Sequence, residues 1–310
     1  MRSFFGGVKW MTGVAVLIAC AAAQAQQADE KATQTKATAK PGTNALFEQL
    51  QADGVKFGAG TVKLPKPSRP DGLDAVAQQA ALAKIADENH PVEALTRKAV
   101  VAPFILKIAD EKVSGAARPR RVDLWFVAYG DVHKMTDETF VKQSVDAEAA
   151  AAPDAPQGAV LTDEELKSRG IMPEPDEKYL AATMNLFNRV RLSGAMRTML
   201  TRTDESVLAA GMLDPRFAKD DKYPNTWRPI VREESGAQKL GPAQPYSSAA
   251  WYAKATRLAK PTGAVLVELH LVFDEPEGWF NGANLLRSKL PIVAQDGVRK
   301  IRRKIAEQGE

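Results

Sequence analysis

A chain of 310 residues that is 45% hydrophobic and 26% charged has the composition of a folded soluble protein, which excludes global disorder. Its formal net charge of +4 includes Arg2 and Lys9, which lie in a segment that we expect to be removed. The remaining charge gives no large uniform field, so nucleic acid is not an expected partner. Because Cys20 is the only cysteine, the folded part has no disulfide, thiolate zinc site or cysteine nucleophile.

The first 25 residues have the three parts of a secretory signal: early positive charge, an apolar run over about 11–23, and small residues at 23–25. The run is shorter than the roughly 20 residues that span a bilayer. Residues 17–20 also match a bacterial lipobox, in which Cys20 is lipidated and becomes the N-terminus. Both routes predict export, either to the periplasm or to a membrane as a lipoprotein.

Residues 26–42 are mostly Gln, Ala, Lys and Thr with nothing large and apolar to bury, which predicts a flexible tether. Thr43 is placed to cap a short helix that ends near Gly54. A strand within 55–64 comes next. The proline-rich connector that follows, 65–70, is expected to be extended and exposed.

An alanine-rich helix begins at Asp71 or Asp74 and runs to about residue 88, and a shorter helix begins at Pro91. Two similar hairpins are then predicted. The first pairs alternating rows at 100–108 and 122–128, and Pro103 indicates that its first strand lies at a sheet edge. The second pairs 248–258 with 263–273, a central strand with one apolar face formed by Val265, Val267, Leu269, Leu271 and Phe273.

Between the hairpins, the alanine and proline run at 148–158 predicts a mobile loop. Thr162 and Glu165 form a capping box for a short helix. A β-meander is predicted over 179–213, and the charged segment 214–241 is expected to be mostly loop.

The chain closes with a basic amphipathic helix that is expected to start at about Ala294. Hairpins and a meander dominate, and no regular strand–helix alternation implies parallel crossovers. We therefore predict one α+β domain over 43–308, built on a largely antiparallel sheet with flanking helices at both ends.

Glu268 and His270 are the weak catalytic candidates, because side chains two apart on a strand leave the same face and a carboxylate can orient an imidazole. Solvent-facing polar residues explain the pair equally well. Asp131 and His133 are weak metal candidates at a strand end, and Trp279 lies in a turn where it either binds a ligand or folds back onto the core.

Arg189, Arg191 and Arg197 lie in a window without acids and are candidates for a basic patch that binds an anionic polymer or a membrane surface. Pairing with acidic residues elsewhere in the chain is the alternative.

The leading prediction is an exported cell-envelope protein that acts as a non-catalytic binding or structural module with no cofactor. A hydrolase that uses carboxylates and histidine is the alternative, together with the anionic-surface binder. These hypotheses are compatible with an envelope protein or an anionic surface as the partner. Membrane contact is expected only through a lipid on Cys20.

Overall fold

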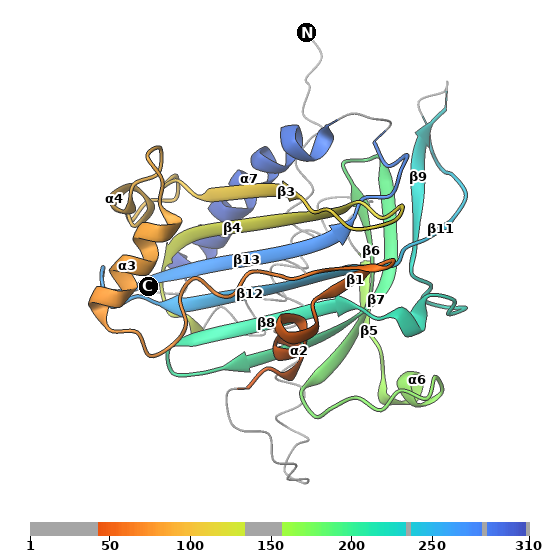
Figure 1. Ribbon diagram of the computed structural model, residues 1–310, viewed down its shortest axis with the longest axis horizontal. Helices are drawn as coiled ribbons and strands as arrows, with labels where there is room; N and C mark the ends of the chain where they lie inside the picture. Colours follow the sequence, from red (N-terminus) through yellow and green to blue (C-terminus); the bar gives the residue numbers. More distant parts are fainter. Residues whose placement is uncertain (1–42, 134–156, 234–236, 281–283, 308–310) are drawn as a thin grey trace.

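The computed structural model describes residues 43–133, 157–233, 237–280 and 284–307 (Figure 1). The predicted leader, the tether and residues 148–156 of the predicted mobile loop lie outside these ranges. The described part confirms the α+β class, since helices flank a large antiparallel sheet.

The helices are α2 (Ala45–Asp53), α3 (Ala75–Ile85), α4 (Val92–Leu95), α6 (Asp163–Lys167) and α7 (Leu285–Glu307), with a 3-10 turn η2 at Pro215–Phe217. The strands are β1 (Val55–Phe57), β2 (Gly60–Val62), β3 (Ile105–Asp110), β4 (Pro119–Tyr129), β5 (Gln157–Val160), β6 (Glu177–Leu186), β7 (Val190–Arg202), β8 (Ser206–Leu213), β9 (Thr226–Arg232), β10 (Gln238–Leu240), β11 (Gln244–Pro245), β12 (Ala249–Arg257) and β13 (Ala264–Asp274).

The main sheet has the strand order β10-β9-β7-β8-β12-β13-β4-β3, with β6 also paired to β7, β5 to β6, and β11 to β9. The two predicted hairpins are joined through their second strands, because β13 pairs with β4 from Ala264–Tyr129 to Asp274–Pro119. Strand β13 is therefore paired on both sides, and β3 lies at the end of this strand order as Pro103 predicted.

The two faces of the sheet pack against different parts of the chain. Alternate residues of β13, β12 and β4, including Val267, Trp251 and Leu124, pack with the inner side of α7 in the largest core cluster. On the other face, residues 43–95, which we call the N-terminal layer, cover the part formed by β8, β12, β13 and β4, and α6 and η2 pack against β6 and β7. Leu46 of α2 packs near Tyr252, and Leu82 of α3 packs near Trp125. Figure 1 shows α2 and α3 in front of the sheet and α7 behind it.

Two sequence-based expectations differ from the structure. Helix α7 begins at Leu285, well before the expected Ala294, and contains Pro291. A proline removes a helical N–H, but burial of Leu286 and Leu290 against the sheet holds the first turns in place. The segment 214–241 is mostly loop as expected, but it also contains two strands that were not predicted, β9 paired with β7 and β10 paired with β9.

Candidate binding groove between β3 and α7

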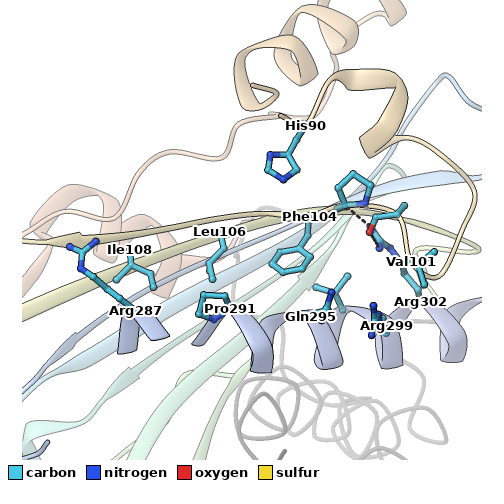
Figure 2. Close-up of a pocket in the computed structure, with 13 residues that line it drawn as sticks. His90, Val101, Phe104, Leu106, Ile108, Arg287, Pro291, Gln295, Arg299 and Arg302 are labelled. Atoms are coloured by element: carbon cyan, nitrogen blue, oxygen red, sulfur yellow. Dashed lines mark hydrogen bonds between the residues drawn. The ribbon is translucent and has the colours of Figure 1, made fainter. Parts of the chain in front are cut away.

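A groove of about 520 Å³ lies between the edge strand β3, the segment before it and helix α7 (Figure 2). Most of its lining side chains are apolar. Phe104, Leu106 and Ile108 come from β3 and the residue before it, and Pro291 and Val298 come from α7. Figure 2 shows Phe104 pointing toward the helix and His90 on the opposite side of the strand from α7. The groove thus has apolar walls on two elements that are far apart in the sequence.

The alternation of the strand explains the apolar wall on β3. Phe104, Leu106 and Ile108 are spaced two apart, so they leave the same face of the sheet and pack against the main core cluster. Each is only partly buried, because no described strand lies beyond β3 and α7 covers the row incompletely. An apolar surface of this kind is available to a ligand.

Arg302 fastens the segment before β3 to α7. Its Nε donates to the carbonyl of Val127 at 2.8 Å, and Nη2 donates to the carbonyl of Pro103 at 2.9 Å. Nη1 donates to the carbonyls of Val100, at 3.2 Å, and of Ala102. Burial lowers the pKa of Arg302 to about 10. One guanidinium therefore fixes the end of the groove and uses four of its five N–H donors in these bonds.

Two further arginines give the groove a basic character. Arg287 and Arg299 lie toward opposite ends of the helical wall (Figure 2). Nη2 of Arg287 lies 3.2 Å from Oδ1 of Asp110, so the first charge is already paired. Arg299 has no ion pair or hydrogen bond from its side chain within the described ranges. Among the lining residues that the structure describes, Arg299 is therefore available to meet an acidic group in the groove.

A second, smaller cavity of about 110 Å³ lies on the α7 side of the sheet and is lined almost entirely by apolar side chains, among them Met184, Met196 and Trp251. The indole Nε1 of Trp251 is buried without a hydrogen-bond partner. The cavity is too small for a typical ligand of drug size, for which pockets are about 300–1,000 Å³.

The structure places Glu268 and His270 in one cluster with a third residue, Asp123, that was not predicted from the sequence. Nδ1 of His270 lies 2.8 Å from Oδ1 of Asp123, and Nε2 lies 3.4 Å from Oε2 of Glu268. We call these three residues the buried histidine cluster, since Glu268 and His270 are 0% exposed and Asp123 is 4% exposed. Asp123 was missed because it is on β4, and only the β4–β13 register places it opposite His270.

Burial alone would lower the pKa of His270, but its hydrogen bonds to Asp123 and Glu268 outweigh that effect, and the pKa lies above its ordinary value. The ring also stacks on Tyr252, with centroids 4.7 Å apart, and meets the edge of Trp125 at 5.1 Å. These contacts hold the imidazole inside the protein.

The proline-rich connector closes the buried histidine cluster. The backbone N–H of Ser68 donates to Oε2 of Glu268 at 2.8 Å, and the indole N–H of Trp125 donates to the Ser68 hydroxyl at 2.9 Å. Next to it, Arg69 is 2% exposed, so the prediction that this connector is exposed is wrong there. Lys254 fixes the same segment by an ion pair of 2.7 Å to Asp71. A substrate has no route to Glu268 or His270 in this arrangement.

Asp131 and His133 lie apart from the buried histidine cluster. Asp131 is exposed, and its Oδ1 accepts a hydrogen bond of 2.9 Å from the backbone N–H of His133, which is a local turn contact. Within the described ranges no group of three or more His, Cys, Asp or Glu residues is arranged to hold a metal ion. Trp279 is 3% exposed and stacks on Tyr246 at 5.6 Å, so it folds back onto the core.

The three predicted arginines do not form one patch. Arg189 is exposed in the β6–β7 turn, and Nε of Arg197 lies 3.2 Å from Oε1 of Glu177. Nε of Arg191 donates to Oδ1 of Asn185 at 2.9 Å. Arg191 and Arg197 share a face of β7 but are six residues apart, which corresponds to about 20 Å along a strand.

No family model and no curated protein matches the sequence. The chain resembles solved structures only distantly. It is 7% identical to the lipid transfer and protein localization domain of human StarD13 (DLC2), with a TM-score of 0.33, covering 76% of this chain and 98% of that one. It is 7% identical to human STARD10, with a TM-score of 0.35 and coverages of 75% and 81%. An uncharacterized protein from Rhizobium leguminosarum is 10% identical, with a TM-score of 0.30 and coverages of 61% and 98%. Likenesses at this level carry no argument about function, which is therefore derived from the geometry alone.

Proposed function

We propose that the protein is a non-catalytic binding module whose groove between β3 and α7 takes a small molecule with an apolar body and an acidic group. The observation that supports this proposal is the combination of an open apolar groove with Arg299, a lining cation without a partner within the described residues. The volume of about 520 Å³ lies within the range of typical small-molecule sites.

The chemistry of the lining defines the ligand class. Phe104 and Leu106 on one wall and Val298 on the other bury an apolar chain or ring, which supplies most of the binding free energy. A guanidinium such as that of Arg299 presents a planar fork of donors that matches a carboxylate. The ligand's acidic group is therefore expected to lie at the Arg299 end of the groove.

The groove is tested with dodecanoate as the probe and dodecanol as its uncharged counterpart, by isothermal titration calorimetry. Arg299→Gln is expected to weaken dodecanoate about 10-fold or more and to leave dodecanol unchanged, because only the acid uses the guanidinium. Val101→Asp is expected to weaken dodecanoate as well. Val101 is 64% exposed and lines the groove, so the new carboxylate repels the probe without disturbing the core.

Arg303→Gln is the matched control, because Arg303 is exposed on the same helix and is not among the groove residues. Equal affinity of the wild type and Arg299→Gln for dodecanoate would reject the proposed position of the acid. Failure of the wild type to bind either probe would reject the groove itself.

The hydrolase alternative is not favoured by the geometry. It requires Glu268 and His270 to meet a substrate, and the connector that carries Ser68 and Arg69 covers both. Asp131 and His133 lie in a separate turn and add no group to the pair.

Export remains part of the proposal, because the first 25 residues carry the three features of a secretory signal. The described helices include none that is long and apolar enough to cross a membrane. Cys20→Ser separates the two processing routes: a lipoprotein loses its membrane association while export continues, and a protein cleaved after Ala25 is unchanged. Fractionation followed by N-terminal sequencing gives the answer, and recovery of the chain from the cytoplasm with Met1 intact would refute export.

A further inference from the structure

A further cleft, of about 800 Å³, is separate from the groove and from the small cavity described above. It lies on the sheet face opposite the main core cluster and at the other end of the sheet from β3. Strands β6, β7 and β9 form its floor, and the segment around Lys222 and Tyr223 forms one side. The polar side chains that line this cleft are hydroxyl and basic groups set among small apolar residues, and no acidic residue lines it.

The strand register places six polar side chains in two cross-strand rows. Thr183 pairs with Ser193, and Ser193 pairs with Thr226, so three hydroxyl groups lie side by side on neighbouring strands. The next row consists of Asn185, Arg191 and Arg228, from the same three strands in the same order. Because successive alternate residues share one face, both rows face the same side of the sheet. We call them the hydroxyl row and the arginine row.

The arginine row contains two like charges at directly opposed positions. Arg191 and Arg228 are cross-strand partners, an arrangement that destabilises a sheet when nothing neutralises it. Nε of Arg191 donates to Asn185, which is neutral, and the exposed Arg228 has no side-chain partner within the described residues. The nearby Lys222 does not add to this excess, since its Nζ lies 2.8 Å from Oε1 of Glu165.

The hydroxyl row is equipped to donate hydrogen bonds to the same ligand. Oγ1 of Thr183 and Oγ of Ser193 lie 3.0 Å apart, and one hydroxyl donates to the other, which leaves one proton of the pair for a ligand. All three hydroxyl residues are partly exposed. Two guanidinium groups beside a row of hydroxyl donors suit a tetrahedral oxyanion with several acceptor oxygens.

We propose that this cleft binds a phosphorylated, hydroxylated small molecule, with the phosphate held between Arg191 and Arg228 and the hydroxylated body over the hydroxyl row. The cleft volume exceeds what a phosphate ion alone needs, and the hydroxyl groups of Thr183, Ser193 and Thr226 supply both donors and acceptors for sugar-type hydroxyl groups. The site is independent of the groove between β3 and α7.

The probes are glucose 6-phosphate, inorganic phosphate and glucose, titrated by calorimetry at constant ionic strength. Glucose 6-phosphate is expected to bind more tightly than inorganic phosphate, and glucose is expected to bind least. Arg228→Gln and Arg191→Gln are each expected to weaken both phosphate probes about 10-fold or more. Arg257→Gln, at an exposed position on β12 outside the cleft, is the matched control and is expected to bind as the wild type does.

Thermal unfolding provides a second readout, in which the effect of Arg228→Gln on the Tm differs between chloride and phosphate buffers. In chloride buffer, Arg228→Gln is expected to raise the Tm because it removes the opposed charge. In phosphate, the wild type is expected to gain Tm through ligand binding, and Arg228→Gln is expected to lose that gain. Equal phosphate-dependent gains in the wild type and both arginine variants, or no binding of either phosphate probe by the wild type, would overturn the proposal. Binding of inorganic phosphate as tight as that of glucose 6-phosphate would overturn the assignment of the hydroxylated body.

Discussion

Replacing His270 by alanine is expected to lower the free energy of unfolding by about 3–5 kcal/mol, as measured by urea denaturation at pH 6. The substitution leaves the carboxylates of Asp123 and Glu268 buried without the imidazole that lies between them. It also removes a ring that stacks on Tyr252. His90→Ala is the control: His90 is partly exposed and pairs with Asp87 at the surface, so a loss below about 1 kcal/mol is expected.

The effect of His270 depends on pH in a defined direction. Because the folded-state pKa lies above the ordinary value of 6.5, the protonated ring contributes its full stability below about pH 6.5 and loses it as pH rises through the folded-state pKa. The difference between the wild type and His270→Gln is therefore expected to be largest in mildly acidic buffer and to shrink in alkaline buffer. A constant difference from pH 5.5 to 9 would show that folding does not shift the pKa of His270, and a difference that grows as pH rises would show that the folded protein holds the ring uncharged. Either result would contradict this assignment.

Arg302→Met is expected to lower the free energy of unfolding by about 3 kcal/mol or more, because it leaves buried carbonyl groups without a donor. The lost bonds include those to Val127 and Ala102, which are both buried. Methionine keeps much of the apolar stem and so isolates the contribution of the guanidinium. The same variant is expected to loosen the segment that carries Val101, and dodecanoate affinity is expected to fall with it.

Arg303→Met is the control for that experiment, since the neighbouring side chain is exposed and its removal is expected to change stability by less than about 0.5 kcal/mol. If Arg302→Met were as stable as this control, Arg302 would not be what holds the segment before β3 on the helix.

The centre of the sheet was predictable from the sequence because the patterns that specify it lie within a few neighbouring residues. Every second residue from Val265 to Phe273 is apolar, Gly263 and the residues before it form a turn, and the row from Trp251 to Ala255 packs on the same core. Thr162 and Glu165 likewise form the predicted capping box, which needs only two side chains three residues apart. Patterns of this kind are complete within a few residues and do not depend on the rest of the fold.

The two clefts could not be predicted, because each is formed by segments that only the tertiary structure brings together. The groove needs α7 to lie along β3, and a helix that starts at about Ala294 does not include Arg287 and Pro291, which form the first part of the groove's helical wall. Arg228 was assigned to a loop because the segment 214–241 is rich in charged residues and poor in apolar ones, so its pairing with Arg191 was not visible. The alternation of Trp227 with Thr226 and Arg228 was the available signal for β9, and it was too short to stand out.

The pairing of β4 with β13 also sets the order in which the chain folds. Contacts such as the one between Asp123 and His270 join residues 147 positions apart, so the middle of the sheet forms only when almost the whole polypeptide has left the ribosome. Until β13 arrives, β4 has one unpaired edge and an apolar face without its helix. A nascent chain of this protein is therefore expected to remain unfolded until β13 has been synthesised. Fragments that end before residue 264 are expected to aggregate or be degraded instead of folding in part.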